Sequence, residues 1–205
     1  KPPRNILLVF FADEEAGSNY GSRWLVKHRP EIFDGYSEAV SEVGGFSVTI
    51  TGEHRLYLIE AAQKGIQWMK LTAKGTAGHG SFINQDNAVT KISDAVARIG
   101  AYEWPQLETK TSNFFFRKIA ELTGDKYDPK NFKPLLRHLG DAVRMLGATI
   151  SNTANPTMLE AGYKVNVIPQ SASAMVDGRF LPGHENQLQE TIKKLAGDEI
   201  EIEIL

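Results

Sequence analysis

The sequence predicts a mixed α/β chain in two parts. An apolar run at residues 6–11 leads into an acidic turn that contains glycine, which is typical of a buried strand in a doubly wound α/β domain. From residue 65 onward a strand, a helix, further strands, a second helix and a last strand follow in order, which is the pattern of a two-layer α+β sandwich. We therefore expect a partial α/β domain at residues 1–57 and, at residues 58–205, an α+β domain with a four-stranded antiparallel sheet and two helices.

The first region is expected to contain three elements. The strand at Ile6 to Phe11 is followed by a helix around Tyr20 to His28 and by a short strand near Ala39 to Glu42. A candidate linker at Thr51 to His54 follows, because its glycine and polar residues favour a loop.

The second region begins with a strand at Gly65 to Ala73 and an amphipathic helix. Asp86 is predicted to mark the start of that helix and Gly100 to end it. Its apolar residues recur at helical spacing: Ala88, Val89, Ile92, Ala95, Val96 and Ile99.

The rest of the second region returns to the sheet. Strands are expected near Thr149 to Asn152, Lys164 to Ile168 and Ser171 to Phe180, followed by a helix near Glu185 to Ala196. Gly197 is predicted to end this helix. In the last segment Ile200, Ile202 and Ile204 alternate with Glu, as in a half-buried strand.

The composition excludes several classes of protein. The 205 residues are 41% hydrophobic, carry a formal net charge of -2 and include no Cys. A disulfide framework is therefore excluded. Near-neutral charge without a basic cluster argues against nucleic acid, and no apolar segment reaches the ~20 residues that a membrane helix needs. We expect a soluble protein with no nucleic-acid or membrane partner, located in the cytoplasm.

Five short motifs carry candidate functional residues in a fixed order. They are Ala12-Asp13-Glu14-Glu15-Ala16-Gly17, Ser41-Glu42-Val43-Gly44-Gly45, Gly75-Thr76-Ala77-Gly78-His79-Gly80-Ser81, Asn166-Val167-Ile168-Pro169 and Asp177-Gly178-Arg179-Phe180-Leu181-Pro182-Gly183. Together they resemble the dinuclear zinc metallopeptidases that include aminoacylases, carboxypeptidase G, carboxypeptidase S and succinyl-diaminopimelate desuccinylase. The resemblance extends over nearly the whole chain.

This resemblance implies an activity and an assembly. The activity is zinc-dependent hydrolysis of an amide or peptide bond next to a free carboxylate, with two zinc ions per intact active site. Small peptides or N-acyl amino acids would be the substrates. Residues 58–205 would form a lid domain whose sheet edge and helices join two copies in a homodimer.

The resemblance also implies a role for three carboxylates. Glu14 matches the general base that takes a proton from the zinc-bridging water, and Glu15 and Glu42 match zinc ligands. Carboxylate oxygen is a suitable zinc ligand, and the base must lie beside the metal without being bound as a ligand. The alternatives are a solvated acidic loop for Glu14 and Glu15 and an ordinary surface position for Glu42.

Three residues of the second region match positions that act on the substrate, largely across the dimer. His79 matches a histidine from the partner subunit that supports the oxyanion of the tetrahedral intermediate. Asn166 and Arg179 match residues that hold the substrate's amide and carboxylate groups. The alternatives are a structural histidine, a turn before Val167, and an ion pair of Arg179 with Asp177 or another acid.

Residues 104–146 form an expected helical insertion in the second region. It carries Phe114-Phe115-Phe116 and a helical stretch at Pro134 to Leu146. Aromatic residues at this density are most often core residues. Alternatively, the insertion caps the substrate cleft and helps to select a bulky or apolar acyl group.

The sequence departs from the family pattern in its metal ligands. An upstream His-x-Asp pair, a bridging carboxylate and a downstream zinc-binding His are not present, whereas a catalytic zinc normally keeps three protein ligands. We therefore expect an internal fragment that is inactive alone and has an incomplete zinc site. A noncatalytic dimerisation or binding module is the alternative function.

Overall fold

The structure is a computed structural model that describes residues 3–40, 45–52 and 54–205. The chain divides into two compact units, Lys1–Val43 and Gly44–Leu205. Among the described residues, no helix is long and apolar enough to cross a lipid bilayer.

The first unit contains helix α1 (Ser22–His28) and the short 3-10 helix η1 (Pro30–Phe33). The helix predicted around residues 20–28 is therefore confirmed, whereas the strand predicted at residues 6–11 is wrong. That run pairs with no strand among the described residues and is exposed, with Ile6 at 67% and Phe10 at 93%. A strand needs a hydrogen-bonded neighbour, and a buried strand needs both faces covered. The strand predicted near residues 39–42 is not formed at 39 and 40, and its last two positions, including Glu42, lie outside the described residues.

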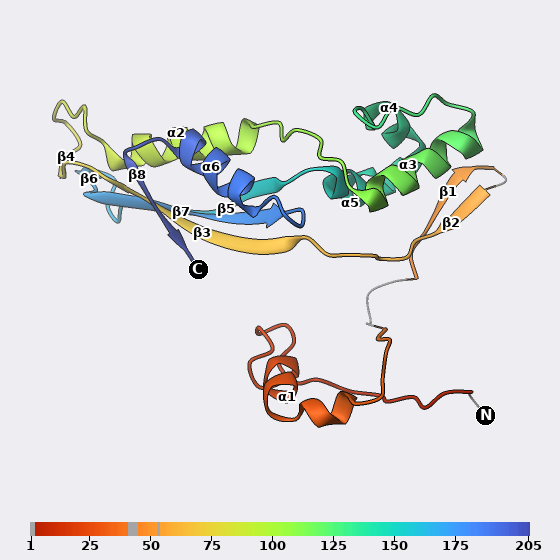
Figure 1. The fold of residues 1–205 in the computed structure, drawn as a ribbon. Coiled ribbons are helices and arrows are strands. Elements are labelled where there is room, and N and C mark those ends of the chain that lie inside the picture. Colours follow the sequence, from red (N-terminus) through yellow and green to blue (C-terminus); the bar gives the residue numbers. More distant parts are fainter. Residues whose placement is uncertain (1–2, 41–44, 53) are drawn as a thin grey trace. The chain divides into compact units, whose positions relative to one another are not determined.

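The second unit is built on a four-stranded antiparallel sheet with the order β5-β7-β3-β8. The strands are β3 (Gly65–Lys74), β5 (Thr153–Ala161), β7 (Ser171–Phe180) and β8 (Ile200–Ile204). Helices α2 (Ala88–Ala101) and α6 (Glu185–Ala196) cover one face of this sheet, as Figure 1 shows. The expected two-layer α+β domain is confirmed.

The core of this domain lies between the sheet and the two helices. Alternate residues of β3 point into it, and Met69, Leu71 and Ala73 are at most 1% exposed. Opposite them, Ile92 of α2 and Ile192 of α6 are fully buried. Each buried Leu, Ile or Met side chain contributes roughly 1.5–3 kcal/mol of hydrophobic stabilisation. The other face of the sheet carries polar residues and exposed apolar residues, so the domain has one covered and one open face.

Several element boundaries differ from those predicted. The N-cap of α2 is Asn87, whose side chain accepts from two backbone N–H groups, and α2 continues past Gly100. Residues 148–150 form the 3-10 helix η3 (Ala148–Ile150) rather than a strand, and β5 starts at Thr153. Within the stretch 164–168, only β6 (Val167–Ile168) pairs, with β4 (Gly78–His79).

Residues 104–150 form a second core together with a β-hairpin. The helical elements are α3 (Lys110–Thr123), α4 (Lys133–Leu136), η2 (Arg137–Ala142) and α5 (Val143–Gly147), and the hairpin is β1 (Ser47–Thr51) with β2 (His54–Tyr57). The predicted helical stretch at 134–146 is broken at Gly140, whose φ is 52°. Phe116 and Phe132 stack with ring centroids 4.5 Å apart and are fully buried, whereas Phe114 is 67% exposed.

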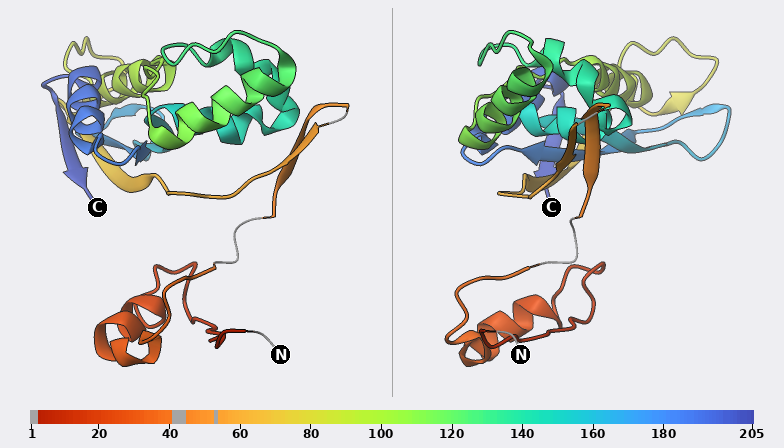
Figure 2. Two further views of the ribbon diagram at one scale, coloured as in Figure 1. Left: turned by 45° about the vertical axis from the view of Figure 1, so that its right-hand side comes forward. Right: turned by 90° about the vertical axis from the view of Figure 1, so that its right-hand side faces the viewer.

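The hairpin residues Val48 and Ile50 belong to this second core. The packing groups the hairpin with the insertion, although the sequence placed it in the first region. The division at residues 57 and 58 stays a prediction. Figure 2 shows the hairpin, the insertion and the sheet from two further sides.

Candidate functional site

His79 is presented on a small two-stranded ribbon at one end of the sheet. His79 of β4 pairs with Val167 of β6, and the N–H of Gly80 donates to the carbonyl oxygen of Asn166 at 2.9 Å. Figure 1 shows this ribbon at the end of the sheet away from the insertion. The pairing brings His79 and Asn166 together from positions 87 residues apart, and both side chains are exposed.

The contacts of His79 favour one tautomer. The backbone N–H of Ser81 donates to His79 Nδ1 at 3.3 Å, and the Ser81 hydroxyl lies 2.8 Å from the same nitrogen. Because Nδ1 accepts a hydrogen bond, a neutral imidazole carries its proton on Nε2. His79 therefore presents an N–H donor away from the loop.

Asn166 adds a second donor beside the first. Its Nδ2 lies 3.4 Å from His79 Nε2. With the proton on Nε2, both nitrogens are donors in this amide orientation, and an oxygen that approaches both can accept from both; in the flipped orientation, Asn166 Oδ1 accepts from His79 Nε2–H. An oxyanion or a carbonyl oxygen fits this arrangement, and the ring of Phe82 lies beside it with its centroid 5.7 Å from that of His79.

Arg179 lies elsewhere, on the open face of the sheet near its other end. In β7 it is paired with Ile66 of β3 and Thr153 of β5. Its Nε and Nη2 donate to the two carboxylate oxygens of Asp177 at 2.6 and 2.9 Å. The ion pair considered as an alternative is therefore present. It uses one edge of the guanidinium, which leaves the Nη1 and Nη2 edge available for a second carboxylate.

Asp177 holds Arg179 in this orientation. Its hydrogen bonds from Arg179 lower the pKa of the Asp177 carboxyl below its ordinary value, and a hydrogen bond with Trp68 of β3 acts in the same direction. Asp177 is thus anionic at neutral pH and is held by Arg179 of its own strand and by Trp68 of the neighbouring strand. This makes the guanidinium a pre-oriented donor.

Lys64 connects the start of β3 to the end of the insertion. Its Nζ donates to the carbonyl oxygens of Ala148 and Ser151 at 3.1 and 2.8 Å and to Thr153 Oγ1 at 3.1 Å. Burial, and secondarily the positive charge of Arg179, lowers the pKa of Lys64 to about 8. The sequence contains no signal for this role of Lys64, because a single Lys before a strand is usually solvated.

The lowered pKa of Lys64 predicts a pH dependence of stability. Between about pH 8 and 10.5 the unfolded chain keeps the Lys64 proton and the folded chain has lost it, so the free energy of unfolding rises with pH. Urea unfolding of the wild type and of Lys64→Met, measured at neutral pH and at about pH 9.5, should show this rise only in the wild type. Parallel pH profiles for the two proteins would contradict the lowered pKa.

The first unit carries Glu14 and Glu15 in an exposed turn. The turn is closed by backbone bonds to the carbonyl oxygen of Asp13 from Ala16 and Ser18, and Asp13 has a positive φ of 48°. Both glutamates are exposed. In the described part of the chain, no three His, Asp or Glu side chains converge on a metal position.

The predicted site residues therefore fall into separate groups. His79 and Asn166 are brought together, Arg179 lies at the other end of the same sheet, and Glu14 and Glu15 belong to the other unit. From the sequence, Asp177 is considered only as an ion-pair partner of Arg179, which is the alternative to substrate binding. Its position two residues before Arg179 on the same strand face was the signal for a supporting role.

Comparisons with known proteins find aminoacylases and carboxypeptidase S-like proteins among the relatives of this chain. Aminoacylase-1 from Sus scrofa is 27% identical over 192 residues, which cover 91% of this chain and 38% of that protein. Probable carboxypeptidase S-like 2 from Dictyostelium discoideum is 23% identical over 225 residues, which cover 97% of this chain and 40% of that protein. The chain thus spans about two fifths of the length of these curated relatives.

A solved structure and a family model also match. The M20 family metallo-carboxypeptidase Sso-CP2 from Sulfolobus solfataricus aligns with a TM-score of 0.45 at 18% identity, covering 69% of this chain and 37% of that chain. Residues 61–202 match the model of the M20 peptidase dimerisation domain, which is more than half of the chain. The chain therefore belongs to the M20 peptidase dimerisation domain family.

Proposed function

We propose that the full-length protein is a zinc-dependent hydrolase that works as a homodimer through this domain. It cleaves an amide or peptide bond next to a free carboxylate, in N-acyl amino acids or small peptides. Membership of the M20 peptidase dimerisation family and the aminoacylase and carboxypeptidase relatives support this kind of reaction.

The observation that carries the proposal is the pair of donors at His79 and Asn166. They lie 3.4 Å apart on an exposed ribbon and form half of a site, because their contacts among the described residues include the Ser81 hydroxyl and the Phe82 ring but no carboxylate. A donor pair that stabilises developing negative charge must face the reacting carbonyl. We assign this pair to the active site of the partner subunit, where it supports the oxyanion and the substrate amide.

Two further roles complete the proposal. The free edge of the Arg179 guanidinium receives the substrate carboxylate with two parallel hydrogen bonds, while Asp177 holds the other edge. Glu14 accepts the proton of the attacking water, which a carboxylate does when it is placed within hydrogen-bond reach.

The donor chemistry of the acidic turn suits zinc, but the described residues do not form a complete site. Glu15 would supply one oxygen ligand, and a catalytic zinc normally keeps three protein ligands and an open position. When bound, the metal would polarise the scissile carbonyl and the attacking water. The remaining ligands would come from Glu42 and from the part of the full-length protein outside this chain.

Mixing two inactive full-length variants tests the shared site. Glu14→Gln and His79→Ala dimers should each be inactive, and subunit exchange should restore about a quarter of the wild-type activity. Half of the dimers are then mixed, and one of the two sites in each mixed dimer has both Glu14 and His79. Hydrolysis of an N-acyl amino acid, followed over time after mixing, gives the readout.

The control is a double variant that carries both changes in one chain, mixed with Glu14→Gln. This mixture contains no chain with an intact Glu14 and should stay inactive. If the first mixture also stays inactive although exchange is verified, His79 does not act across the dimer. If the wild-type protein itself turns over no substrate, the noncatalytic dimerisation module is the better description.

A further inference from the structure

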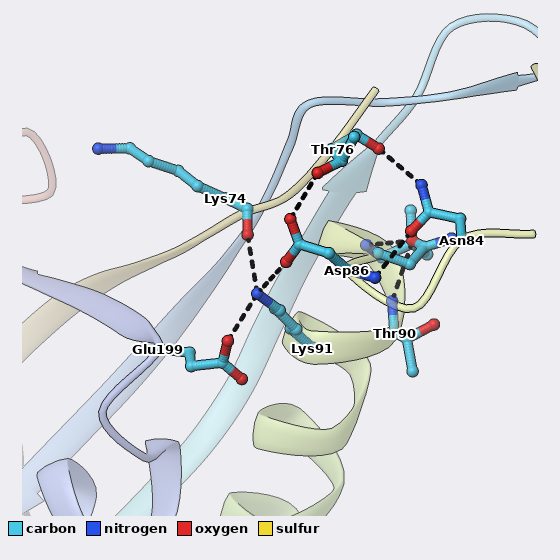
Figure 3. Close-up of polar contacts among 9 residues, drawn as sticks. Lys74, Thr76, Asn84, Asp86, Thr90, Lys91 and Glu199 are labelled. Carbon is cyan, nitrogen blue, oxygen red and sulfur yellow. Dashed lines mark hydrogen bonds and ion pairs between the residues drawn. The ribbon is translucent and has the colours of Figure 1, made fainter. Parts of the chain in front are cut away.

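The loop that carries His79 is closed at its base by a compact set of polar contacts. Figure 3 shows these contacts between the end of β3 and the start of α2. Thr76 binds Asp86 twice, with its N–H donating to the Asp86 carbonyl oxygen at 2.8 Å and its hydroxyl to Oδ2 at 2.7 Å. Asn84 Nδ2 donates to the Thr76 carbonyl oxygen at 2.7 Å, and the Asp86 N–H donates to Asn84 Oδ1 at 2.9 Å.

The backbone also comes together at this point. A Cβ on Gly75 would lie 2.4 Å from the carbonyl oxygen of Asp86 and 2.7 Å from the nitrogen of Ala88. No side chain fits there, because both contacts are with backbone atoms. Residues 76–86 therefore form a loop with a closed neck, and His79 lies in its far part.

Lys91 of α2 fastens this neck to the rest of the domain. Its Nζ lies 2.5 Å from Asp86 Oδ1, 2.7 Å from Glu199 Oε1 and 3.3 Å from the carbonyl oxygen of Lys74. These partners come from the loop, from the turn before β8 and from the end of β3, as Figure 3 shows. One ammonium group thus links the end of β3 and the start of α2, which are near in sequence, to the distant turn before β8.

Burial distinguishes Lys91 from ordinary surface lysines of this domain. Its side chain is 19% exposed, whereas Lys74, which pairs with Glu201 at 3.1 Å, is 75% exposed. The side chains of Asp86 and Glu199 are 51% and 71% exposed, so each ion pair contributes little to stability, but a part-buried ammonium with three acceptors holds its partners in a defined geometry. The hydrogen bond from Lys91 also lowers the pKa of Asp86, so that Asp86 stays anionic at neutral pH.

We infer that Lys91 is a positioning residue that acts through Asp86 to hold the loop of His79 in the orientation needed for catalysis. The inference rests on the proposed role of His79. With Lys91 in place, the neck can adopt one arrangement, and the ribbon of β4 and β6 extends from it in a fixed direction. Without Lys91, the Thr76 to Asp86 contacts remain, and Asp86 still precedes the N-cap of α2, but the neck loses its side-chain link to Glu199 and to the end of β3.

The expected consequence is a split between kcat and KM. A donor to the oxyanion acts when charge develops, so a misplaced His79 lowers kcat and changes substrate binding little. A displacement of about 1 Å can cost up to 10²-fold in rate. We expect Lys91→Met to lower kcat about tenfold with KM within about twofold of the wild type.

The experiment compares four variants of the full-length dimer. Lys91→Met removes the anchor, Lys91→Arg keeps a cation that reaches the same acceptors, and Asp86→Asn keeps the shape of the neck without its charge. Lys74→Met is the matched control, because it removes a neighbouring exposed ion pair and keeps the Lys74 carbonyl oxygen. Steady-state kinetics is combined with amide hydrogen exchange of Thr76 and Gly80, whose N–H groups bind Asp86 and Asn166.

The inference is supported if Lys91→Met lowers kcat and speeds exchange at both amides. Lys91→Arg should largely restore kcat, and Lys74→Met should not lower it. Equal kinetics and exchange in Lys91→Met and Lys74→Met would overturn it. If Lys91→Met does not fold, Asp86→Asn decides in the same way. A His79→Ala variant with unchanged kcat would refute the role of His79, and the exchange rates would still show whether Lys91 anchors the loop.

Discussion

Replacing Glu14 with Gln in the full-length protein should lower kcat by ~10²-fold or more while the zinc content stays at the wild-type value. The amide has the shape of the carboxylate but cannot accept the proton of the attacking water. Activity against an N-acyl amino acid and metal analysis of the same preparation measure both quantities. Circular dichroism checks that the variant is folded.

The neighbouring Glu15→Gln variant is the matched comparison. It should lose bound zinc as well as activity, because an amide oxygen is a poorer zinc ligand than a carboxylate. Near-normal turnover in Glu14→Gln would show that another group is the base. Loss of zinc in Glu14→Gln and retention in Glu15→Gln would exchange the two assignments.

Replacing Arg179 with Ala should raise KM for a substrate with a free carboxylate by about 10²-fold. Two charge-assisted hydrogen bonds to the substrate carboxylate are lost, and each contributes roughly 1.5–3 kcal/mol. The substitution also leaves Asp177 without its ion-pair partner. Arg179→Lys should restore little, because an ammonium cannot bind both carboxylates in parallel. Steady-state kinetics of each variant with the carboxylate substrate and with the matching carboxamide gives the selectivity.

The selectivity ratio separates binding from a general loss of structure. Arg179→Ala should remove the preference for carboxylate over carboxamide, and Asp177→Asn should reduce it by a smaller factor, since it loosens the guanidinium without removing it. A preference that survives in Arg179→Ala would assign the substrate carboxylate to another cation. Equal losses on both substrates would indicate damage to the sheet.

The elements that could be predicted from the sequence are those with complete local signals. The segments at 185–196 and 200–204 have an amphipathic repeat ended by Gly197 and a strict Ile/Glu alternation, and the structure forms both with the predicted bounds. Helix α3 lies within the predicted helical insertion at 104–146, but its bounds are not predicted from the sequence, although Thr109 and Ser112 form a capping box and Gly124 adopts the left-handed conformation at its end.

The elements that could not be predicted depend on distant partners. Strand β5 is an edge strand that contains Pro156, with an irregular register between Pro156 and Met158, so its strand signal is weak. The run at residues 6–11 has a strong strand signal and no pairing strand among the described residues. The contact of His79 with Asn166 joins two loops that are close only because β4 pairs with β6. The spacing of residues along the chain does not predict this pairing.

We expect the exposed run at residues 6–11 to make this chain prone to cross-β aggregation. Six consecutive residues of high strand propensity without charge or Pro can stack on copies of themselves, and Phe10 is 93% exposed. Light scattering on the chain should therefore distinguish two kinds of association, the proposed closed dimer through the domain at 44–205 and open-ended stacking of this run. A charged gatekeeper at Phe10, such as Phe10→Lys, should suppress the second kind and leave the first.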